Sequence, residues 1–441
     1  MKFYAAAGAK TPVPVILMPV IPPDFLIRMK ELIESISNGQ LENRWEGRLL
    51  PETLARVTGP FYFDRARLLR VRIPLTEPFR ISSGGMGAKE ALLVELGDGG
   101  ESGWGESSAV SGSFYSSETP ESCLRDLLET VLPRVLGRDF KSILELDTLL
   151  NQITANRFAR VAVETAAWEA VARRRNLPMS QLLQLPKPAN VPCGLTVGLY
   201  DSEAQLLAAI HRLWSSDYQR LKIKIKRGFD VALVRAVRKE FGDIPLYADA
   251  NGDYGREDFR VFQELDDYGL LMFEQPLARE DLEGAALLQR QVRTPLCLDE
   301  SIETAEQARQ AIAAGACRII NIKLQRVGGF LEALRIMEVA RSHGIALWLG
   351  TMPELGLGAA QALALCGDPG VVFPTDVVPS RRWYVDDIVE PEIRMFPGGL
   401  RIAEGSGVGY RVSEIKAKQY AVETWRLDSS RNGAVRASRA L

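Results

Sequence analysis

The sequence predicts an α/β fold, a (β/α)7β TIM-like barrel joined to an α+β capping domain. From residue 190 onward, eight short β-rich runs alternate with seven segments of amphipathic helical periodicity, a pattern that favours parallel strands joined by crossover helices. Polar residues also recur where successive strands should end, at positions 224, 249, 274, 299 and 323, which are 25, 25, 25 and 24 residues apart. A doubly wound open sheet is the alternative, but no glycine-rich phosphate turn opens the first βα unit.

The chain before the barrel is predicted to form an extension and a separate domain. Residues 1–62 are an N-terminal extension whose role is unknown, with a proline-rich start and one amphipathic helix expected over 24–36. Residues 63–185 should form the α+β capping domain. Its strands are expected over 68–73 and 91–96 with a glycine-rich turn at 97–100, and its helices over 121–136, 143–153 and 159–175.

Residues 190–380 should form the barrel, and residues 381–441 should complete the capping domain and end in a frayed tail. Because barrel strands all point their C-terminal ends to one mouth, side chains at the strand ends should converge there. The strands are expected to end near Thr196, Lys224, Asp249, Glu274, Asp299, Lys323, Gly350 and Asp376. The helices between them are expected over 203–215, 231–241, 257–267, 281–291, 304–314, 330–342 and 355–365.

The composition excludes several classes of function. The 441 residues carry 54 Lys and Arg against 56 Asp and Glu, a balance without the electrostatic footprint of a nucleic-acid or membrane-surface protein. Two histidines are too few for a histidine-rich metal site, and five scattered cysteines without a C-x-x-C pair indicate reduced thiols. No apolar run reaches the ~18 residues of a membrane span. We expect a cytoplasmic homo-oligomer with a small-molecule carboxylate substrate and no nucleic-acid or membrane partner.

Three carboxylates should lie side by side at the barrel mouth. Asp249, Glu274 and Asp299 end neighbouring strands, which lie ~4.8 Å apart, and uncompensated anions this close must bind protons or hold a cation. Oxygen ligands with a charge of about −3 suit a hard cation, so the sequence predicts a Mg²⁺ site, with Mn²⁺ or Ca²⁺ as alternatives. The simpler interpretation, that each acid pairs with a lysine or caps a helix, suits one such acid better than three at equal spacing.

Two lysines flank these acids from opposite sides. Lys224 ends the strand before them and Lys323 ends the strand after them, while Lys222 shares the inward face of the Lys224 strand and should support charge. A partly desolvated amine near a metal can act as a base. A hard metal with two opposed bases predicts proton abstraction α to a carboxylate, with the metal stabilising the enediolate. A barrel that binds metal and ligand without catalysis is the alternative, but binding alone needs no base on each face.

These motifs resemble the enolase superfamily, and within it the o-succinylbenzoate synthase and N-succinylamino acid racemase group. The resemblance covers about 79–409 and rests on Lys222, Lys224, Asp249, Asn251, Glu274, Asp299 and Lys323. It implies that Lys224 removes the α proton of a succinylated hydroxycyclohexadiene carboxylate and helps hydroxide to leave, giving o-succinylbenzoate for menaquinone biosynthesis. The resemblance leaves open racemisation of an N-acylamino acid by both lysines, and also muconate cycloisomerisation.

The resemblance also implies which residues touch the substrate. Arg326 and Glu300 are expected to support the metal ligands and lysines from behind. Thr351 and Thr375 each replace a glycine of the family pattern, and such changes after the seventh and in the eighth strand concern the distal end of the substrate. The expected substrate contacts are Thr196, Lys222, Asn251, Gly350, Thr351, Met352 and Tyr115, the last in a loop that should cover the mouth together with the segment 79–82.

Overall fold

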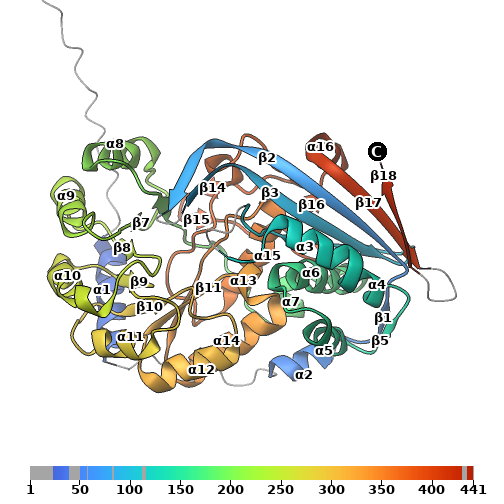
Figure 1. Ribbon diagram of the computed structural model, residues 1–441, viewed down its shortest axis with the longest axis horizontal. Coiled ribbons are helices and arrows are strands. Elements are labelled where there is room, and N and C mark those ends of the chain that lie inside the picture. Colours follow the sequence, from blue (N-terminus) through green and yellow to red (C-terminus); the bar gives the residue numbers. More distant parts are fainter. Residues whose placement is uncertain are drawn as a thin grey trace, which may run out of the picture.

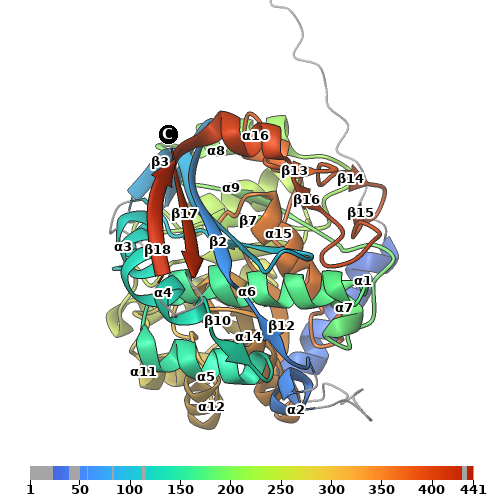
Figure 2. The same cartoon turned by 90° about the vertical axis from the view of Figure 1, so that its right-hand side faces the viewer.

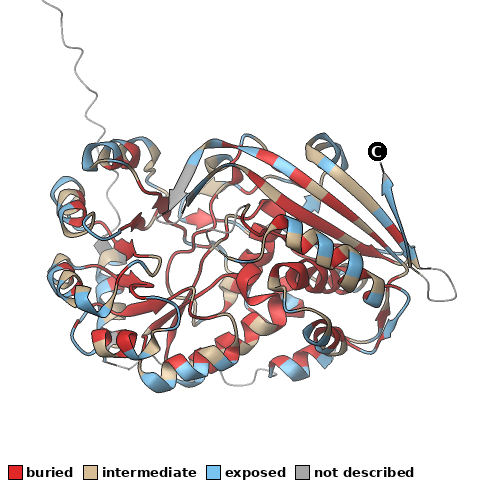
Figure 3. Cartoon of the chain, viewed as in Figure 1, coloured by how far each residue is buried: buried red, intermediate tan, exposed pale blue. Residues whose placement is uncertain are grey.

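The computed structural model describes residues 23–38, 50–56, 58–81, 84–111, 116–429 and 435–440. Long antiparallel strands occupy one end of the molecule, and short parallel strands with their helices occupy the other (Figure 1). Buried residues line the parallel strands and the inner faces of the helices around them (Figure 3). Of the described helices, none is long and apolar enough to cross a membrane.

Seven parallel strands form one continuous sheet in chain order, which confirms the predicted barrel architecture. All their residues are buried, as expected when helices cover one face of a sheet and the other face is packed inside a barrel. The strands are β6 (Leu195–Val197), β7 (Leu221–Lys224), β8 (Leu246–Asp249), β9 (Met272–Glu274), β10 (Leu296–Leu298), β11 (Ile319–Ile322) and β12 (Ala346–Leu349).

The predicted eighth strand is reduced to two isolated bridges. Val371 pairs with Leu347 of β12, and Thr375 pairs with Cys193 just before β6, so this segment joins the two ends of the sheet. Pro374 lies between the bridges and has no N–H to donate, which interrupts a regular ladder. The chain near Asp376 therefore closes the ring without forming a continuous strand.

Helices follow the strands at nearly the predicted positions, and α9 and α14 match the predicted ranges 231–241 and 330–342. One short helix, α13 (Leu324–Val327), follows β11 directly and is too short for periodicity to predict. It ends at Gly328, whose φ of +88° is a left-handed conformation that glycine adopts readily. The longer barrel helices are α8 (Glu203–Leu213), α9 (Val231–Phe241), α10 (Phe259–Leu265), α11 (Leu282–Gln289), α12 (Ala305–Ala314), α14 (Phe330–Ser342) and α15 (Gly356–Leu363).

A second sheet and its helices form what we call the capping domain. Helix α6 packs closely on β4 because two glycines leave room for it: a Cβ on Gly103 or Gly105 would lie 2.1 or 1.9 Å from the carbonyl oxygens of Ala166 and Ala162. The main elements are β2 (Arg65–Ile81), β3 (Gly84–Gly97), β4 (Gly103–Ser107), α3 (Pro120–Asp126), α4 (Leu132–Val135), α5 (Ile143–Ile153) and α6 (Arg157–Arg174). Shorter elements are β1 (Phe61–Tyr62), β5 (Asp139–Phe140), α7 (Met179–Leu182), β13 (Val389–Glu390), β14 (Met395–Phe396), β15 (Gly399–Leu400), β16 (Arg411–Val412) and α16 (Glu414–Tyr420).

The C-terminal residues join the capping sheet, which corrects the prediction of a frayed tail. Strand β17 (Ala421–Ser429) pairs with β2, and β18 (Val435–Ala440) pairs with β17 (Figure 2). The sheet therefore has the order β18-β17-β2-β3-β4. Pairing with β17 satisfies the N–H and C=O groups along the edge of β2, and Leu427 is fully buried. The sequence of β18 did not indicate a strand, because Arg436 and Arg439 stand among small residues and no alternation of apolar and polar side chains is visible.

The first helix of the N-terminal extension packs on the barrel. In α1 (Pro23–Ser37), Met29 and Ile36 are buried in a cluster with Tyr247 and Trp348 from the barrel strands. Further members of this cluster come from the first residues of β9, β11 and β12, so α1 lies at the N-terminal end of the barrel interior. This end is opposite the strand ends that carry the predicted site.

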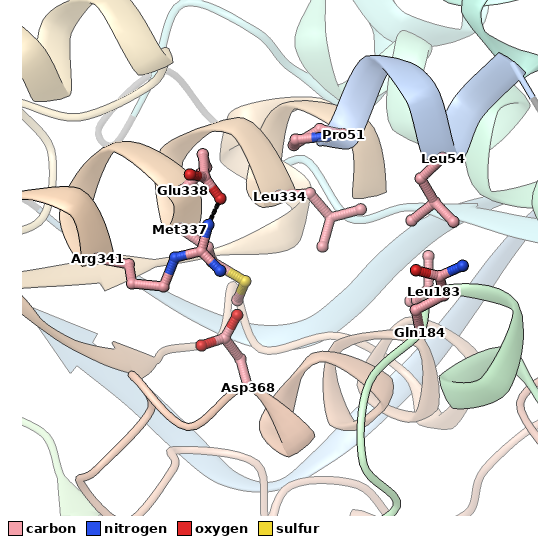
Figure 4. Close-up of a pocket in the computed structure, with 9 residues that line it drawn as sticks. All are labelled: Pro51, Leu54, Leu183, Gln184, Leu334, Met337, Glu338, Arg341 and Asp368. Atoms are coloured by element: carbon pink, nitrogen blue, oxygen red, sulfur yellow. Dashed lines mark ion pairs between the residues drawn. The ribbon is translucent and has the colours of Figure 1, made fainter. Parts of the chain in front are cut away.

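The second helix of the extension connects the two parts of the molecule. Helix α2 (Pro51–Arg56) lies against α5 and α14. Arg335 of α14 pairs with Glu52 at 2.9 Å and with Asp147 of α5 at 3.0 Å, so one guanidinium joins the extension, the capping domain and the barrel. A small pocket beside α2 is lined by Leu54 and by Leu334 of α14 (Figure 4).

Candidate active site

The ends of β7 to β11 bring the predicted charged residues into one buried layer. The strand register places Lys224 beside Asp249 and Asp249 beside Glu274. Asp299 and Lys323 directly follow the last residues of β10 and β11. None of these five side chains belongs to a residue more than 7 % exposed. The structure thus gathers residues that are up to 99 positions apart in the sequence.

Lys222 lies among the carboxylates of this layer. Its Nζ is 2.7 Å from Glu274 Oε2, 2.9 Å from Asp249 Oδ2 and 3.5 Å from Asp376 Oδ2. Burial acts against its charged form, but these carboxylates raise the pKa of Lys222 well above its usual value. Lys222 is therefore a permanent positive charge at the centre of the acids.

Lys224 is held by one carboxylate and one amide. Its Nζ donates to Asp249 Oδ2 at 2.5 Å and to Asn251 Oδ1 at 2.8 Å. The Asn251 amide donates in turn to Glu300 Oε1 at 3.0 Å. The backbone of Asn251 has a φ of +46°, a left-handed conformation that asparagine tolerates better than most residues. The chain can therefore turn at the end of β8 while the amide reaches back to the ammonium.

Asp299 is paired with two cations. Lys323 Nζ lies 2.8 Å from Asp299 Oδ2, and Arg326 Nη1 contacts Asp299 Oδ1. Burial acts against the ionised form, but Arg326 and Lys323 lower the pKa of Asp299 below its usual value. Arg326 also donates to the carbonyl oxygens of Asn321 and Ile302, at 2.8 and 3.1 Å, which fixes its guanidinium behind Asp299.

The three acids fit a divalent cation by their chemistry. Asp249, Glu274 and Asp299 are fully buried oxygen donors. Glu274 Oε2 and Asp299 Oδ2 accept no hydrogen bond of good geometry from the described residues, although a lysine ammonium lies within 2.8 Å of each. Lysine and arginine side chains supply the counter-charge in the structure, and among its described residues no group of three His, Cys, Asp or Glu side chains is arranged to hold a metal ion. The chemistry of their oxygen donors makes Asp249, Glu274 and Asp299 the residues that would hold such an ion.

Glu274 differs from the two aspartates in its electrostatics. Burial and the neighbouring charge of Asp249 raise the pKa of Glu274 to about 8. Its Oε1 accepts a hydrogen bond from Asn321 Nδ2 at 3.0 Å. A Cβ on Gly350 would lie 2.5 Å from Asn321 Oδ1, so glycine at this position leaves room for the amide that supports Glu274.

Sequence reasoning missed two further residues of the layer. Arg220 is fully buried, pairs with Asp376 and donates to Thr196 Oγ1 at 3.0 Å. Gln275 has a φ of +38°, and its Oε1 accepts the backbone N–H of Asp299 at 2.9 Å. The alternation of strand side chains could have indicated Arg220, because it lies two residues before Lys222 and shares its face.

Apart from Lys222 and Asn251, which belong to the layer described above, the predicted substrate contacts fall into three groups. Thr196 joins the layer through its hydroxyl, which donates to Asp376 Oδ1 at 2.6 Å. Gly350, Thr351 and Met352 follow β12 at the same end of the barrel, and the Met352 carbonyl lies 3.5 Å from the buried Lys89 ammonium of β3. Tyr115 and the side chains of 79–82 lie outside the described residues.

Comparisons with known proteins agree with this fold. Residues 65–184 match the mandelate racemase/muconate lactonizing enzyme N-terminal domain, and residues 205–416 match the enolase C-terminal domain-like family. The chain is 39 % identical over 354 residues to an o-succinylbenzoate synthase of Geobacillus kaustophilus, covering 80 % of this chain and 94 % of the relative. It is 40 % identical over 343 residues to an N-succinylamino acid racemase of an Amycolatopsis species, covering 78 % and 93 %.

A solved structure supports the same assignment. A member of the enolase superfamily from Listeria innocua superposes with a TM-score of 0.79 at 36 % identity, covering 83 % of this chain and 98 % of that one. We call the buried charged residues at the ends of β7 to β11 the strand-end layer. The fold and this layer together define a barrel protein with a capping domain and a buried set of acids and lysines. The chain belongs to the enolase superfamily.

Proposed function

We propose that this protein is an o-succinylbenzoate synthase that uses Mg²⁺ and dehydrates a succinylated hydroxycyclohexadiene carboxylate. The observation that carries this proposal is the position of Lys224 at the end of β7 and of Lys323 directly after β11, with the three strands whose ends carry the acids between them. Superfamily sites use a Lys or His base with one or two Mg²⁺ ions. Relatives named o-succinylbenzoate synthase at 36–39 % identity support this reaction.

In this proposal, Lys224 moves the protons of the dehydration. As an amine, its Nζ takes the proton from the carbon α to the substrate carboxylate, and the electron pair of that C–H bond enters the ring system. The C–O bond of the ring hydroxyl then breaks, and the departing hydroxide takes the proton from Nζ and leaves as water. A Mg²⁺ ion on Asp249, Glu274 and Asp299 would neutralise the charge that develops on the substrate carboxylate. Lys323, on the opposite side, supplies a positive charge.

Racemisation of an N-succinylamino acid is the second candidate. The placement of a second buried lysine on the opposite side of the acids favours it, because exchange between the two faces of a carbon needs one proton carrier on each face. The Amycolatopsis relative, named as a racemase, is as similar to this chain as the synthases are. Both candidates begin with the same proton abstraction.

Exchange of the substrate α proton with deuterated solvent tests the shared step. We expect exchange, followed by NMR, to require Mg²⁺ and to be abolished by EDTA. Lys224→Ala should lower the exchange rate at least ~10²-fold, the smaller end of a general-base contribution. Lys226→Ala is the matched control, because Lys226 lies on the same segment but is exposed. Wild-type exchange in Lys224→Ala would contradict the assignment of the base, and exchange in EDTA would contradict the metal.

A further inference from the structure

A pocket beside the strand-end layer is lined by a largely buried arginine, Arg382, that the proposed proton chemistry does not use. The pocket has a volume of about 160 Å³ and is lined by Glu77 and Pro78 of β2, by the loop 198–201 after β6, and by Arg382 and Trp383. At ~30 Å³ for each water molecule in the liquid, this space equals about five waters and admits a short carboxyalkyl arm. It lies between the capping domain and the first βα loop of the barrel.

Arg382 is largely, not fully, buried and is poorly supplied with acceptors. Its side chain is 10 % exposed, and Nε meets no hydrogen-bond acceptor among the described residues. The contacts of its other nitrogens are long, at 3.4 Å to Glu77 Oε1 and 3.5 Å to the Thr196 carbonyl. The guanidinium carbon lies 4.5 Å from the ring centroid of Trp383, which also lines the pocket. A buried guanidinium with such weak partners still has free capacity to bind an anion.

The nearby acid does not use up this charge. Glu77 Oε2 pairs at 2.5 Å with Arg212, whose side chain is 58 % exposed, and this contact is much shorter than the 3.4 Å contact with Arg382. Glu77 is therefore the partner of Arg212, and Arg382 keeps a positive charge that faces the pocket. Burial acts against this charge and lowers the pKa of Arg382 from its usual value, an effect that an incoming carboxylate would reverse.

Arg382 is also connected to the strand-end layer. Its Nη2 contacts the carbonyl of Thr196, whose hydroxyl donates to Asp376 at 2.6 Å, and Asp376 lies 3.5 Å from Lys222 Nζ. The backbone beside Arg382 is attached to the capping domain, because the Thr76 N–H of β2 donates to the Trp383 carbonyl at 2.8 Å. An arm that extends from the reacting centre would lead a substrate from the layer toward Arg382.

We infer that Arg382 binds the terminal carboxylate of a succinyl group on the substrate, an inference that rests on the proposed function. The guanidinium offers N–H donors in a planar fork that matches a carboxylate, and its remaining contacts are too long to compete. The pocket thereby selects succinylated substrates over substrates with neutral acyl groups. Arg382 is a specificity residue and takes no part in proton transfer.

Two substrates that differ in one terminal group test this inference. N-succinyl-phenylalanine carries the terminal carboxylate, and N-succinamoyl-phenylalanine carries a neutral amide of the same shape. With Mg²⁺ present, Arg382→Gln should lower kcat/KM for α-proton exchange of the succinyl substrate by about 10–100-fold, the loss expected for a hydrogen bond to a charged group. The succinamoyl substrate should change less than ~3-fold, and Arg382→Lys should restore part of the loss because it keeps the charge.

Arg381→Gln is the matched control, because Arg381 is the preceding residue but is 76 % exposed and pairs with Glu392. It should change neither substrate. Equal losses on both substrates in Arg382→Gln would assign Arg382 a structural role and overturn the inference, and so would no loss on the succinyl substrate.

A binding measurement separates this inference from the proposed function. Calorimetry with o-succinylbenzoate and with benzoate, which lacks the succinyl arm, should show weaker binding of o-succinylbenzoate to Arg382→Gln and unchanged binding of benzoate. If the wild-type protein neither exchanges the amino acid substrates nor dehydrates the succinylated hydroxycyclohexadiene carboxylate, the proposed function fails, and this binding difference alone decides the role of Arg382. Equal o-succinylbenzoate affinity in wild type and Arg382→Gln would refute the carboxylate contact.

Discussion

Helix α1 offers a sharp test of how the N-terminal extension contributes to stability. Ile36 is 1 % exposed in the cluster at the N-terminal end of the barrel, whereas Ile27 on the same helix is 54 % exposed. Truncating a buried isoleucine to alanine removes its apolar contacts and leaves a cavity, so Ile36→Ala should lower the free energy of unfolding by about 2–4 kcal/mol. Ile27→Ala is the matched control and should change it by less than ~0.5 kcal/mol.

Urea unfolding of both variants, followed by fluorescence and circular dichroism, measures this difference. Activity provides a second readout, because α1 lies at the end of the barrel opposite Lys224, and the N-terminal face of such a barrel contributes to stability rather than to chemistry. Below the unfolding transition, kcat/KM of Ile36→Ala should stay within about 2-fold of the wild type, a change of less than ~0.5 kcal/mol. Equal stability losses in the two variants would show that α1 does not pack as described.

Two further predictions concern residues of the layer and of the domain interface. Lys323→Arg keeps the positive charge but is a poor base, so it should lower the rate of racemisation more than the rate of dehydration when both reactions are assayed. Equal losses in the two reactions would contradict the proposal that Lys323 contributes only its charge to dehydration. Glu164, whose carboxylate accepts the Phe330 and Leu331 N–H groups at 2.9 and 3.0 Å, has its pKa raised by burial from 4.5 to about 7. The folded protein therefore keeps this proton after the unfolded chain has lost it, and the resulting stability, up to about 3 kcal/mol, is present below pH ~4.5 and disappears as the pH rises to about 7. Glu164→Gln should remove this part of the pH dependence in urea unfolding measured from pH 5 to pH 8, and an unchanged slope would refute it.

Much of the barrel could be predicted because its constraints are local. Each βα unit repeats one pattern at a nearly constant length, so the interval between Lys224, Asp249, Glu274 and Asp299 was enough to place them on neighbouring strands. The helix over 330–342 followed from periodicity alone. The same reasoning failed near Asp376, where Pro374 interrupts the ladder and pairing depends on both ends of the sheet.

Other features could not be predicted because they depend on contacts between distant segments. The pairing of β17 with β2 joins residues more than 300 positions apart, and nothing in the sequence of β17 indicates its partner. The surroundings of Arg382 likewise come from β2, the loop after β6 and the segment after the barrel. Its burial is a property of the assembled fold, while its sequence neighbour Arg381 is exposed.

The two lysines of β7 differ in role, because one balances the charge of the buried acids and the other is placed to react with the substrate. Lys222 and Lys224 are two residues apart, so both point into the barrel, but Lys222 lies deeper and faces three carboxylates. Lys224 lies at the end of the strand and contacts one carboxylate and a neutral amide. Because Lys222 already balances the buried acids, Lys224 is not needed as their counter-ion. Its position nearer the mouth makes it the lysine that a substrate proton would meet first.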